Sequence, residues 1–178
     1  MTTERSLVLI KHDAVSRGLI GDIISRIEKT GLKVIGMKML VPQKNIAMRH
    51  YKITEDWAKS VFEKAKKVSE ATKKEFKFKD PLAYGEMIHE MNVSYLSEGA
   101  VVALVCEGPH ALEIIRKLVG HTEPRQALTG TIRGDYSYDS YTIADLQKRS
   151  IKNLIHASEN SPEAQREISL WFNDNELV

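Results

Sequence analysis

The stretch "NLIHASE", residues 153–159, holds the histidine whose surroundings best suit chemistry. An apolar run ends at His156, and Ser161 and Pro162 begin a predicted helix a few residues later. The imidazole is therefore expected near the positive end of a helix, where an anionic group is stabilised. Glu167, on the same helix, is one of several polar residues that could fold back toward the ring; a carboxylate there would fix the tautomer and leave the other nitrogen as a nucleophile. A histidine that only caps a strand end is the alternative, and the spacing alone favours it.

Two further segments combine arginine with threonine where loops or helix ends are expected: "RKLVGHTEP" (116–124) and "TGTIRGD" (129–135). Arginine forks and threonine hydroxyls suit phosphate oxygens, although each arginine alone is more typical of a solvated surface charge. The sequence contains no P-loop, GxGxxG, HExxH or GxSxG pattern. What could bind phosphate is a set of cations and hydroxyls scattered over loops.

The elements that position these residues follow from apolar patterning. Strands are predicted at 6–11, 32–40 and 100–108, and the stretch before His156 supplies the last strand. Helices are predicted between Gly18 and Gly31, at 45–51, at 81–96 after the Asp80 N-cap, from Pro109 to Gly120, and from the Ser161–Pro162 cap to Phe172. The order matches an α+β, ferredoxin-like βαββαβ antiparallel sheet, with helices packed mainly on one face.

Composition favours a globular protein of one domain. The chain has 178 residues, of which 42% are hydrophobic and 28% are charged, and its net charge is +2. So small a charge argues against wholesale nucleic-acid coating but leaves room for a local basic patch. The single Cys106 lies in an apolar run, which predicts a buried, inert thiol and excludes a cysteine-rich zinc site. No signal peptide or membrane-spanning stretch is predicted, so we expect a cytoplasmic protein.

Residues 53–92 differ from the rest because they are lysine-rich and helical. The lysines are Lys59, Lys64, Lys66, Lys67, Lys73, Lys74, Lys77 and Lys79. They could form a basic face for a polyanion, but glutamates at helical spacing dilute them and favour an ordinary solvated face. The segment could also form a lid or a subunit contact.

Combined, the motifs resemble the nucleoside diphosphate kinase family in order and spacing. The resemblance is carried by "ERSLVLIKHDAVSRGLIGDII", "HY", "VVALVCEG", "GHTEP", "GTIRGD", "NLIHASE" and "REISLWF". It covers the chain from Glu4 to Val178, except for about residues 53–92 and 136–150. Residues 1–178 are therefore interpreted as one domain with a lysine-rich helical insertion and a short second insertion.

The resemblance implies a ping-pong reaction in which a nucleoside triphosphate phosphorylates His156 and the phosphohistidine then phosphorylates a different nucleoside diphosphate. It implies that Glu167 orients the imidazole, that Ser158 supports Glu167, and that Tyr51 helps to orient the phosphate. Magnesium is expected to bridge the phosphates of the nucleotide rather than occupy a cage of protein ligands. No metal-ligating residue is therefore expected.

The same resemblance assigns the nucleotide contacts. Lys11 would neutralise charge on the moving phosphoryl group, Arg116 and Thr122 would hold the distal phosphates, Arg133 would bridge phosphates across the transfer point, and Asn153 would contact the sugar hydroxyl. The family stacks the base on an aromatic residue, and counting back from Gly99 places Ile88 there, with Tyr84 one turn earlier as the aromatic alternative.

The sequence departs from the family at three positions near the site. His12 replaces a proline after Lys11, Ala157 stands where glycine is common, and Glu159 stands where aspartate is common. They support the alternative of a catalytically weak nucleotide-binding or polyanion-binding assembly component. The family also implies a homo-oligomer, a tetramer or hexamer built from dimers.

Overall fold

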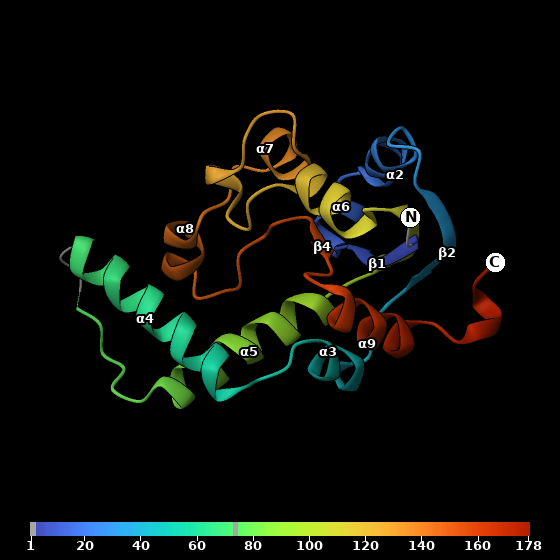
Figure 1. Cartoon of the computed structure of the whole chain (residues 1–178). Helices are drawn as coiled ribbons and strands as arrows, with labels where there is room; N and C mark the ends of the chain where they lie inside the picture. The colour runs from blue at the N-terminus through green and yellow to red at the C-terminus, as the bar shows by residue number, and fades with distance from the viewer. Residues whose placement is uncertain (1–2, 73–74) are drawn as a thin grey trace.

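Four strands form one antiparallel sheet in the part of the chain that the computed structural model describes, residues 3–72 and 75–178. The strand order is β2-β3-β1-β4 (Figure 1), and every pairing is antiparallel. The strands are β1 (Thr3–Ile10), β2 (Lys33–Leu40), β3 (Val101–Pro109) and β4 (Ile155–Ala157). This arrangement confirms the predicted α+β, ferredoxin-like sheet.

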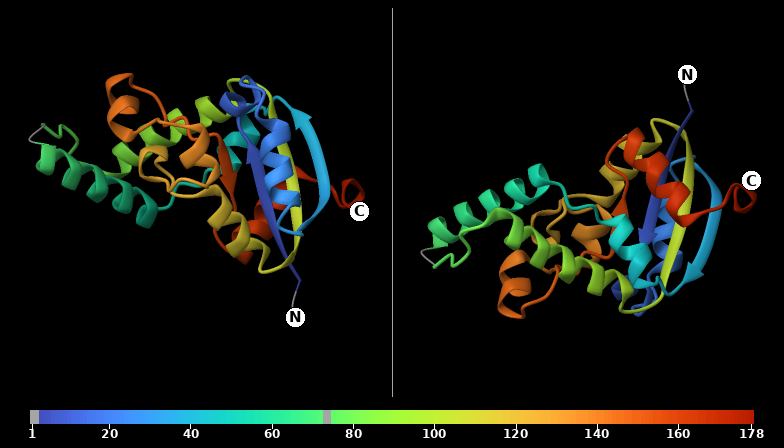
Figure 2. Two further views of the ribbon diagram at one scale, coloured as in Figure 1. Left: turned by 90° about the horizontal axis from the view of Figure 1, so that it is seen from above. Right: turned by 90° about the horizontal axis from the view of Figure 1, so that it is seen from below.

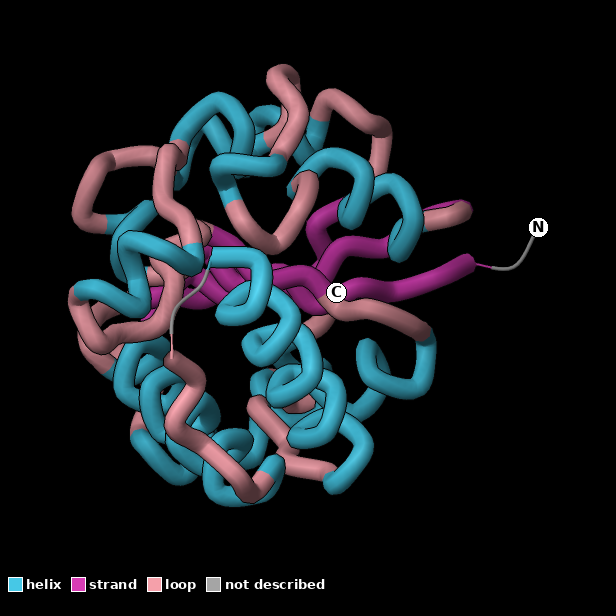
Figure 3. The backbone as a smooth tube through the Cα atoms, turned by 90° about the vertical axis from the view of Figure 1, so that its left-hand side faces the viewer, coloured by secondary structure: helices cyan, strands magenta, loops and turns pink. Residues whose placement is uncertain are grey.

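Helices cover both faces of the sheet, so the expectation that they pack mainly on one face was wrong (Figure 3). One core contains Val8 and Ile10 of β1 and is covered by α2 (Ile20–Glu28) and α6 (Ala111–Val119). The other core contains Leu7 and Leu9, and it is covered by α3 (Lys44–His50), α5 (Pro81–Ser97) and α9 (Ser161–Trp171). The reason lies in the composition of β1 and β3, because a strand buried on both faces is apolar at every position.

The remaining helices are short, except for one. They are α1 (His12–Val15), α4 (Glu55–Thr72), α7 (Ile132–Tyr136), α8 (Tyr141–Leu146) and the 3-10 turns Pro124–Gln126 and Asp174–Glu176. None of the described helices is long and apolar enough to span a membrane.

The start of α5 agrees with the prediction, whereas the starts of α9 and α6 differ from it. Asp80 caps α5 as predicted, because its carboxylate accepts from the backbone N–H groups of Leu82 and Ala83. For α9 the cap is Asn160, whose side chain accepts from the N–H of Glu163, so Ser161 and Pro162 lie inside the helix rather than at its cap. Pro109 ends β3 and does not begin α6.

Helices α4 and α5 pack together and project from the sheet, with α8 nearby (Figure 2). A Cβ at Gly85 would lie 2.8 Å from the Cβ of Ala58, so glycine lets the two helices approach closely. Within residues 53–92 the structure has α4 and most of α5, but residues 75–80 are not helical, and α5 continues to Ser97 and contributes to the core. Of the predicted lysines, Lys73 and Lys74 lie outside the described residues.

Candidate active site

His156 is the middle residue of β4, an edge strand of the sheet, where it lies opposite Leu9 of β1. Its side chain is 21% exposed, so one edge of the ring is open to solvent. Two residues earlier, Leu154 has a positive φ of 68°, a conformation that costs a non-glycine residue about 1 kcal/mol. This bend is fixed on both sides, since Leu154 donates its N–H to Asp13 Oδ2 at 3.1 Å and accepts from the N–H of Lys11 at 2.8 Å.

Glu167 holds the imidazole of His156 in one tautomer. The Nε2–H of His156 donates to Glu167 Oε1 at 3.0 Å, and the Ser158 hydroxyl donates to the other carboxylate oxygen at 2.6 Å. Ser158 is itself fixed, because its Oγ accepts from the backbone N–H of Leu7. Burial alone would raise the pKa of Glu167, but the hydrogen bonds from His156 and Ser158 lower it below the usual value. An ionised Glu167 leaves His156 Nδ1 with a free lone pair, as a nucleophile requires.

A second histidine, His50, packs against the first, and only the dipeptide "HY" pointed to this region beforehand. The rings of His50 and His156 lie edge to face with 4.4 Å between their centroids. His50 is buried, and its Nδ1 accepts from the indole N–H of Trp171 at 3.3 Å. Burial, followed by the charges of His156 and Lys11, holds the pKa of His50 well below its usual range. His50 is therefore neutral and does not compete with His156 for Glu167 as a cation.

Lys11, Asn153 and Thr122 are brought together by hydrogen bonds. The Lys11 ammonium donates to Asn153 Oδ1 at 2.8 Å, and the Asn153 amide donates to the carbonyl of Thr122 at 3.1 Å. Lys11 and Asn153 are buried, whereas Thr122 is exposed. Burial and the charge of Arg133 lower the pKa of Lys11 to about 7, although Asp13 opposes this. The site thus holds an amine that titrates near neutrality.

The Arg133 side chain supports the backbone around the nucleophile. Its guanidinium donates to three carbonyl oxygens: those of Asn153 at 3.1 Å, Gly120 at 2.9 Å and Ile155 at 2.7 Å. A guanidinium has five N–H groups, so others remain that could reach a phosphate. Burial lowers the pKa of Arg133 to about 10, and the group is still a cation at neutral pH.

Arg116 and Tyr51 lie farther out. Arg116 is exposed at the end of α6, close enough to Arg133 that its charge helps to lower the pKa of Arg133. It also lines a hollow of 460 Å³ with Glu113 and Glu159. The Tyr51 ring packs edge to face on His50, with 4.8 Å between centroids, and burial together with the charge of Glu167 raises the pKa of its phenol.

The two candidates for the base contact lie in different surroundings. Ile88 is half-buried on α5. Tyr84 is already packed between aromatic rings, with centroid distances of 5.3 Å to Phe76 and 5.0 Å to Phe78. The cluster around Tyr84 joins α5 to the segment before it, so Ile88 is the freer of the two.

The three departures from the family pattern are accommodated without distortion. α1 begins at His12 despite the missing proline, and the His12 ring packs on Tyr95 at 4.8 Å and lies 3.2 Å from a Glu98 carboxylate oxygen. Ala157 has no positive φ and pairs with Val8 in the sheet, so glycine is not needed there. Glu159 is exposed and lines the same hollow as Arg116.

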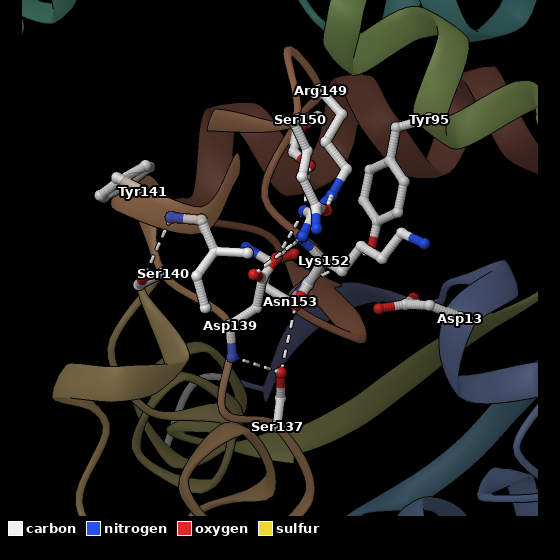
Figure 4. Close-up of polar contacts among 12 residues, drawn as sticks. Asp13, Tyr95, Ser137, Asp139, Ser140, Tyr141, Arg149, Ser150, Lys152 and Asn153 are labelled. Carbon is white, nitrogen blue, oxygen red and sulfur yellow. Dashed lines mark hydrogen bonds and ion pairs between the residues drawn. The ribbon is translucent and has the colours of Figure 1, made fainter. Parts of the chain in front are cut away.

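Asp13 and Tyr95 are further residues that sequence reasoning missed. The Tyr95 phenol accepts from the backbone N–H of Asn153 at 3.2 Å, and burial together with the charge of Asp13 raises the pKa of the phenol. Figure 4 shows Tyr95 and Asn153 side by side, with Asp13 close to them. Asp13 in "KHD" could have been noticed as a polar residue at a strand end, but nothing in the sequence indicated that Tyr95 of α5 would reach it.

The described residues do not form a complete set of protein ligands for a magnesium ion. His50, His156 and Glu167 are the group of three potential metal ligands found there, with donor atoms within 4.8 Å of one another. Magnesium prefers oxygen ligands, and this group has two imidazoles and one carboxylate whose oxygens already accept from His156 and Ser158.

The family model described as nucleoside diphosphate kinase matches residues 4–177. The chain belongs to the nucleoside diphosphate kinase family. It is 42% identical to a nucleoside diphosphate kinase from Pyrobaculum aerophilum, over 100% of both chains, and 38% identical to one from Borreliella burgdorferi, over 100% of this chain and 92% of that protein. By family, the chain is a phosphotransferase.

Comparison with solved structures leads to the same family. An NDP kinase from Pyrobaculum aerophilum superposes with a TM-score of 0.95 at 40% identity, covering 99% of this chain and 100% of that one. A nucleoside-diphosphate kinase from Borrelia burgdorferi, described as a transition state mimic with bound vanadate and ADP, gives a TM-score of 0.81 at 36% identity, covering 99% and 90%.

Proposed function

We propose that the protein transfers the terminal phosphate of a nucleoside triphosphate reversibly to a nucleoside diphosphate, by a ping-pong mechanism through phosphorylated His156. The observation that carries this proposal is the 3.0 Å contact between His156 Nε2 and Glu167, which leaves Nδ1 as the free nitrogen of a ring with an open edge.

In the first half-reaction, the Nδ1 lone pair of His156 attacks the terminal phosphorus. The N–P bond forms as the bond between that phosphorus and its bridging oxygen breaks, and the nucleoside diphosphate leaves with that electron pair. The imidazole becomes positively charged while Nε2 keeps its proton, and Glu167 stabilises that charge. In the second half, a terminal oxygen of another diphosphate attacks the same phosphorus, and the N–P electron pair returns to Nδ1.

The cations around His156 supply most of the remaining catalysis, because phosphoryl transfer needs positioning and charge neutralisation. Lys11 and the free N–H groups of Arg133 neutralise the moving phosphoryl group. Arg116 and Thr122 hold the distal phosphates, Tyr51 orients the phosphate, and Asn153 contacts the sugar hydroxyl while it keeps Lys11 in place.

Magnesium would be bound through the phosphates of the nucleotide. It would supply charge neutralisation between those phosphates, and no carboxylate cage in the described residues is needed for it. Ile88 presses on the base through apolar contact without stacking, which suits broad base tolerance.

The protein is proposed to form a homo-oligomer, a tetramer or hexamer built from dimers. β2 is an edge strand, and Met37, Met39 and Val41 in or beside it are 58%, 56% and 62% exposed. An exposed apolar edge strand is a surface that natural proteins usually cover. The single buried Cys106 is compatible with a reducing compartment, and we place the protein in the cytoplasm.

A two-step label transfer tests the function. The protein is incubated with γ-labelled ATP and magnesium, freed of nucleotide, and then given GDP. Wild type should carry an acid-labile label and pass it to GTP, whereas His156→Ala should remain unlabelled. His110→Asn is the matched control, because His110 is an exposed histidine with φ of 54°, which asparagine tolerates.

A wild type that binds ATP but never carries label would overturn the proposal. The alternative of a weak nucleotide-binding or polyanion-binding assembly component would then gain support. That alternative is not favoured, because His12 and Ala157 fit the site without distorting it.

A further inference from the structure

Residues 137–150, which follow α7 and are called the excursion below, are organised around one buried carboxylate. Asp139 is 5% exposed. Its Oδ2 accepts from Arg149 Nη1 at 2.6 Å, and its Oδ1 accepts from Arg149 Nη2 at 3.0 Å. This fork-to-fork pair is the strongest kind of side-chain ion pair, and it draws the two ends of the excursion together (Figure 4).

The same carboxylate also holds the chain that leads to the nucleophile. Asp139 Oδ2 accepts from the backbone N–H of Lys152 at 2.7 Å, and the Ser137 hydroxyl donates to the carbonyl of Lys152 at 3.2 Å. Lys152 therefore has both of its backbone groups bound by side chains of the excursion.

Three consecutive backbone N–H groups before the nucleophile are bound in this way. That of Lys152 donates to Asp139, that of Asn153 donates to the phenol of Tyr95, and that of Leu154 donates to Asp13. The acceptors come from three separate parts of the chain: the excursion, α5 and α1. No strand ladder fixes residues 152–154, so these three acceptors hold the N–H groups of the segment, while its carbonyls accept from Ser137, Arg133 and the N–H of Lys11.

The excursion also reaches the loop that contains Thr122. The carbonyl of Asp139 accepts from the N–H of Arg125 at 3.1 Å, and the N–H of Tyr141 donates to Glu123 Oε1 at 3.3 Å. Glu123 is 2% exposed and directly follows Thr122. Asp139 thus connects the loop of Thr122 with the segment of Asn153, whose amide in turn donates to the Thr122 carbonyl.

We propose that Asp139 is a positioning residue for phosphoryl transfer. By binding the Lys152 N–H and Arg149, it sets the place of Asn153 and of the Thr122 loop, and so the geometry in which a nucleotide meets Lys11 and His156. The excursion that carries it serves as a brace for the nucleophile strand. This inference rests on the proposed function, because its catalytic part concerns the same phosphoryl transfer.

The test compares Asp139→Asn with a control variant that changes a similarly hydrogen-bonded carboxylate in another part of the chain. Asparagine has nearly the same shape but loses the charge and one acceptor oxygen. Glu176→Gln is the control: both oxygens of Glu176 accept from Lys38 Nζ, at 2.7 and 2.8 Å, and one also accepts from the backbone N–H of Asn173 at 2.8 Å. That carboxylate lies near the C-terminus beside β2, at the opposite edge of the sheet from β4.

Asp139→Asn should weaken ADP binding and raise KM roughly tenfold, with a smaller fall in kcat, because a misplaced contact group costs binding and transfer alike. Glu176→Gln should lower thermal stability and leave ADP affinity, KM and kcat unchanged. Arg149→Gln should match Asp139→Asn, and the double variant should be no worse than either single variant, since the two residues act as one unit.

Arg149→Lys keeps the charge but loses the fork, and it gives a milder perturbation if Asp139→Asn does not fold. The proposal is overturned if the variants that fold, Arg149→Lys included, lose stability but keep the ADP affinity, KM and kcat of wild type, as Glu176→Gln is expected to do. If wild type transfers no phosphate while Asp139→Asn still weakens ADP binding and Glu176→Gln does not, the proposed function fails and the positioning role stands.

Discussion

The amine of Lys11 is expected to gain a proton when a nucleotide binds above neutral pH. Lys11 is 6% exposed, and burial with the charge of Arg133 lowers its pKa to about 7. A bound polyphosphate brings several negative charges next to this amine, and neighbouring opposite charge raises the pKa of an ammonium. Nucleotide binding and proton uptake are therefore linked.

The size of the effect follows from the pKa. With a pKa of about 7, only about one-tenth of the Lys11 amines carry a proton at pH 8, so binding should take up roughly 0.9 proton per nucleotide there and about 0.1 at pH 6. The lowering from 10.5 to about 7 amounts to roughly 5 kcal/mol against the charged amine, at about 1.4 kcal/mol per pH unit. The charge of the nucleotide must offset most of that cost.

Calorimetric titration with ADP and magnesium, in two buffers of different ionisation enthalpy, measures this uptake directly. Lys11→Arg is the matched control, because a guanidinium stays charged at pH 8 and should give no uptake. An uptake below about 0.2 proton in wild type at pH 8, or an equal uptake in Lys11→Arg, would refute the reasoning that the amine is largely neutral before the nucleotide binds.

The lowered pKa of Lys11 also makes the free energy of unfolding depend on pH. Between pH 7 and 10.5 the unfolded chain binds a proton at Lys11 that the folded chain does not, so the contribution of Lys11 to the free energy of unfolding increases as the pH rises through this window. Denaturant unfolding of wild type at pH 7, 8 and 9 should show this increase relative to Lys11→Met, and equal slopes for the two proteins would contradict it.

Three further predictions concern the neighbours of the nucleophile. Glu167→Gln should slow the labelling of His156 by γ-labelled ATP by roughly 10- to 100-fold, because it removes the charge that stabilises the imidazolium; a rate equal to wild type in a single-turnover experiment would exclude that role. Leu154→Gly relieves about 1 kcal/mol of backbone strain but removes a side chain that is 1% exposed, so urea unfolding should show a net loss of roughly 2 kcal/mol, and a gain in stability would show that the strain dominates. His50→Phe leaves the Trp171 N–H without an acceptor and should cost about 1–3 kcal/mol of stability, while the pH profile of kcat should not move because His50 is neutral throughout; a shifted profile would show that His50 titrates with the reaction.

Much of the fold could be predicted because its signals are local. The strands follow from short apolar runs, and the Asp80–Pro81 pair marks the start of α5 correctly. The expectation of helices mainly on one face was wrong even though the signal was present: β1 and β3 are apolar at successive positions, as a sheet covered on both faces requires.

The contact of His156 with Glu167 could be predicted from the sequence, because the two residues lie in neighbouring elements and in the motifs "NLIHASE" and "REISLWF". The contacts of His50 with Trp171, and of Tyr95 and Asp139 with the backbone before His156, were not accessible. The first two contacts join residues 121 and 58 positions apart, and Asp139 is only 13 positions from Lys152, but no periodicity or spacing encodes such a pairing before the path of the chain is known.

Because the N–H groups of residues 152–154 donate to side chains and not to a neighbouring strand, the region around β4 is expected to unfold locally before the rest of the sheet. β1 and β3 are joined by a long ladder, whereas β4 pairs with β1 over only Val8↔Ala157, Leu9↔His156 and Ile10↔Ile155. Opening β4 exposes less apolar surface and breaks fewer main-chain bonds than opening the centre of the sheet, so it is a sub-global event of low free energy. The amides of residues 152–157 should exchange with deuterated solvent before those of β3 residues 102–105, which are paired with strands on both sides. On warming, we expect the protein to lose phosphoryl transfer while most of its sheet is still intact.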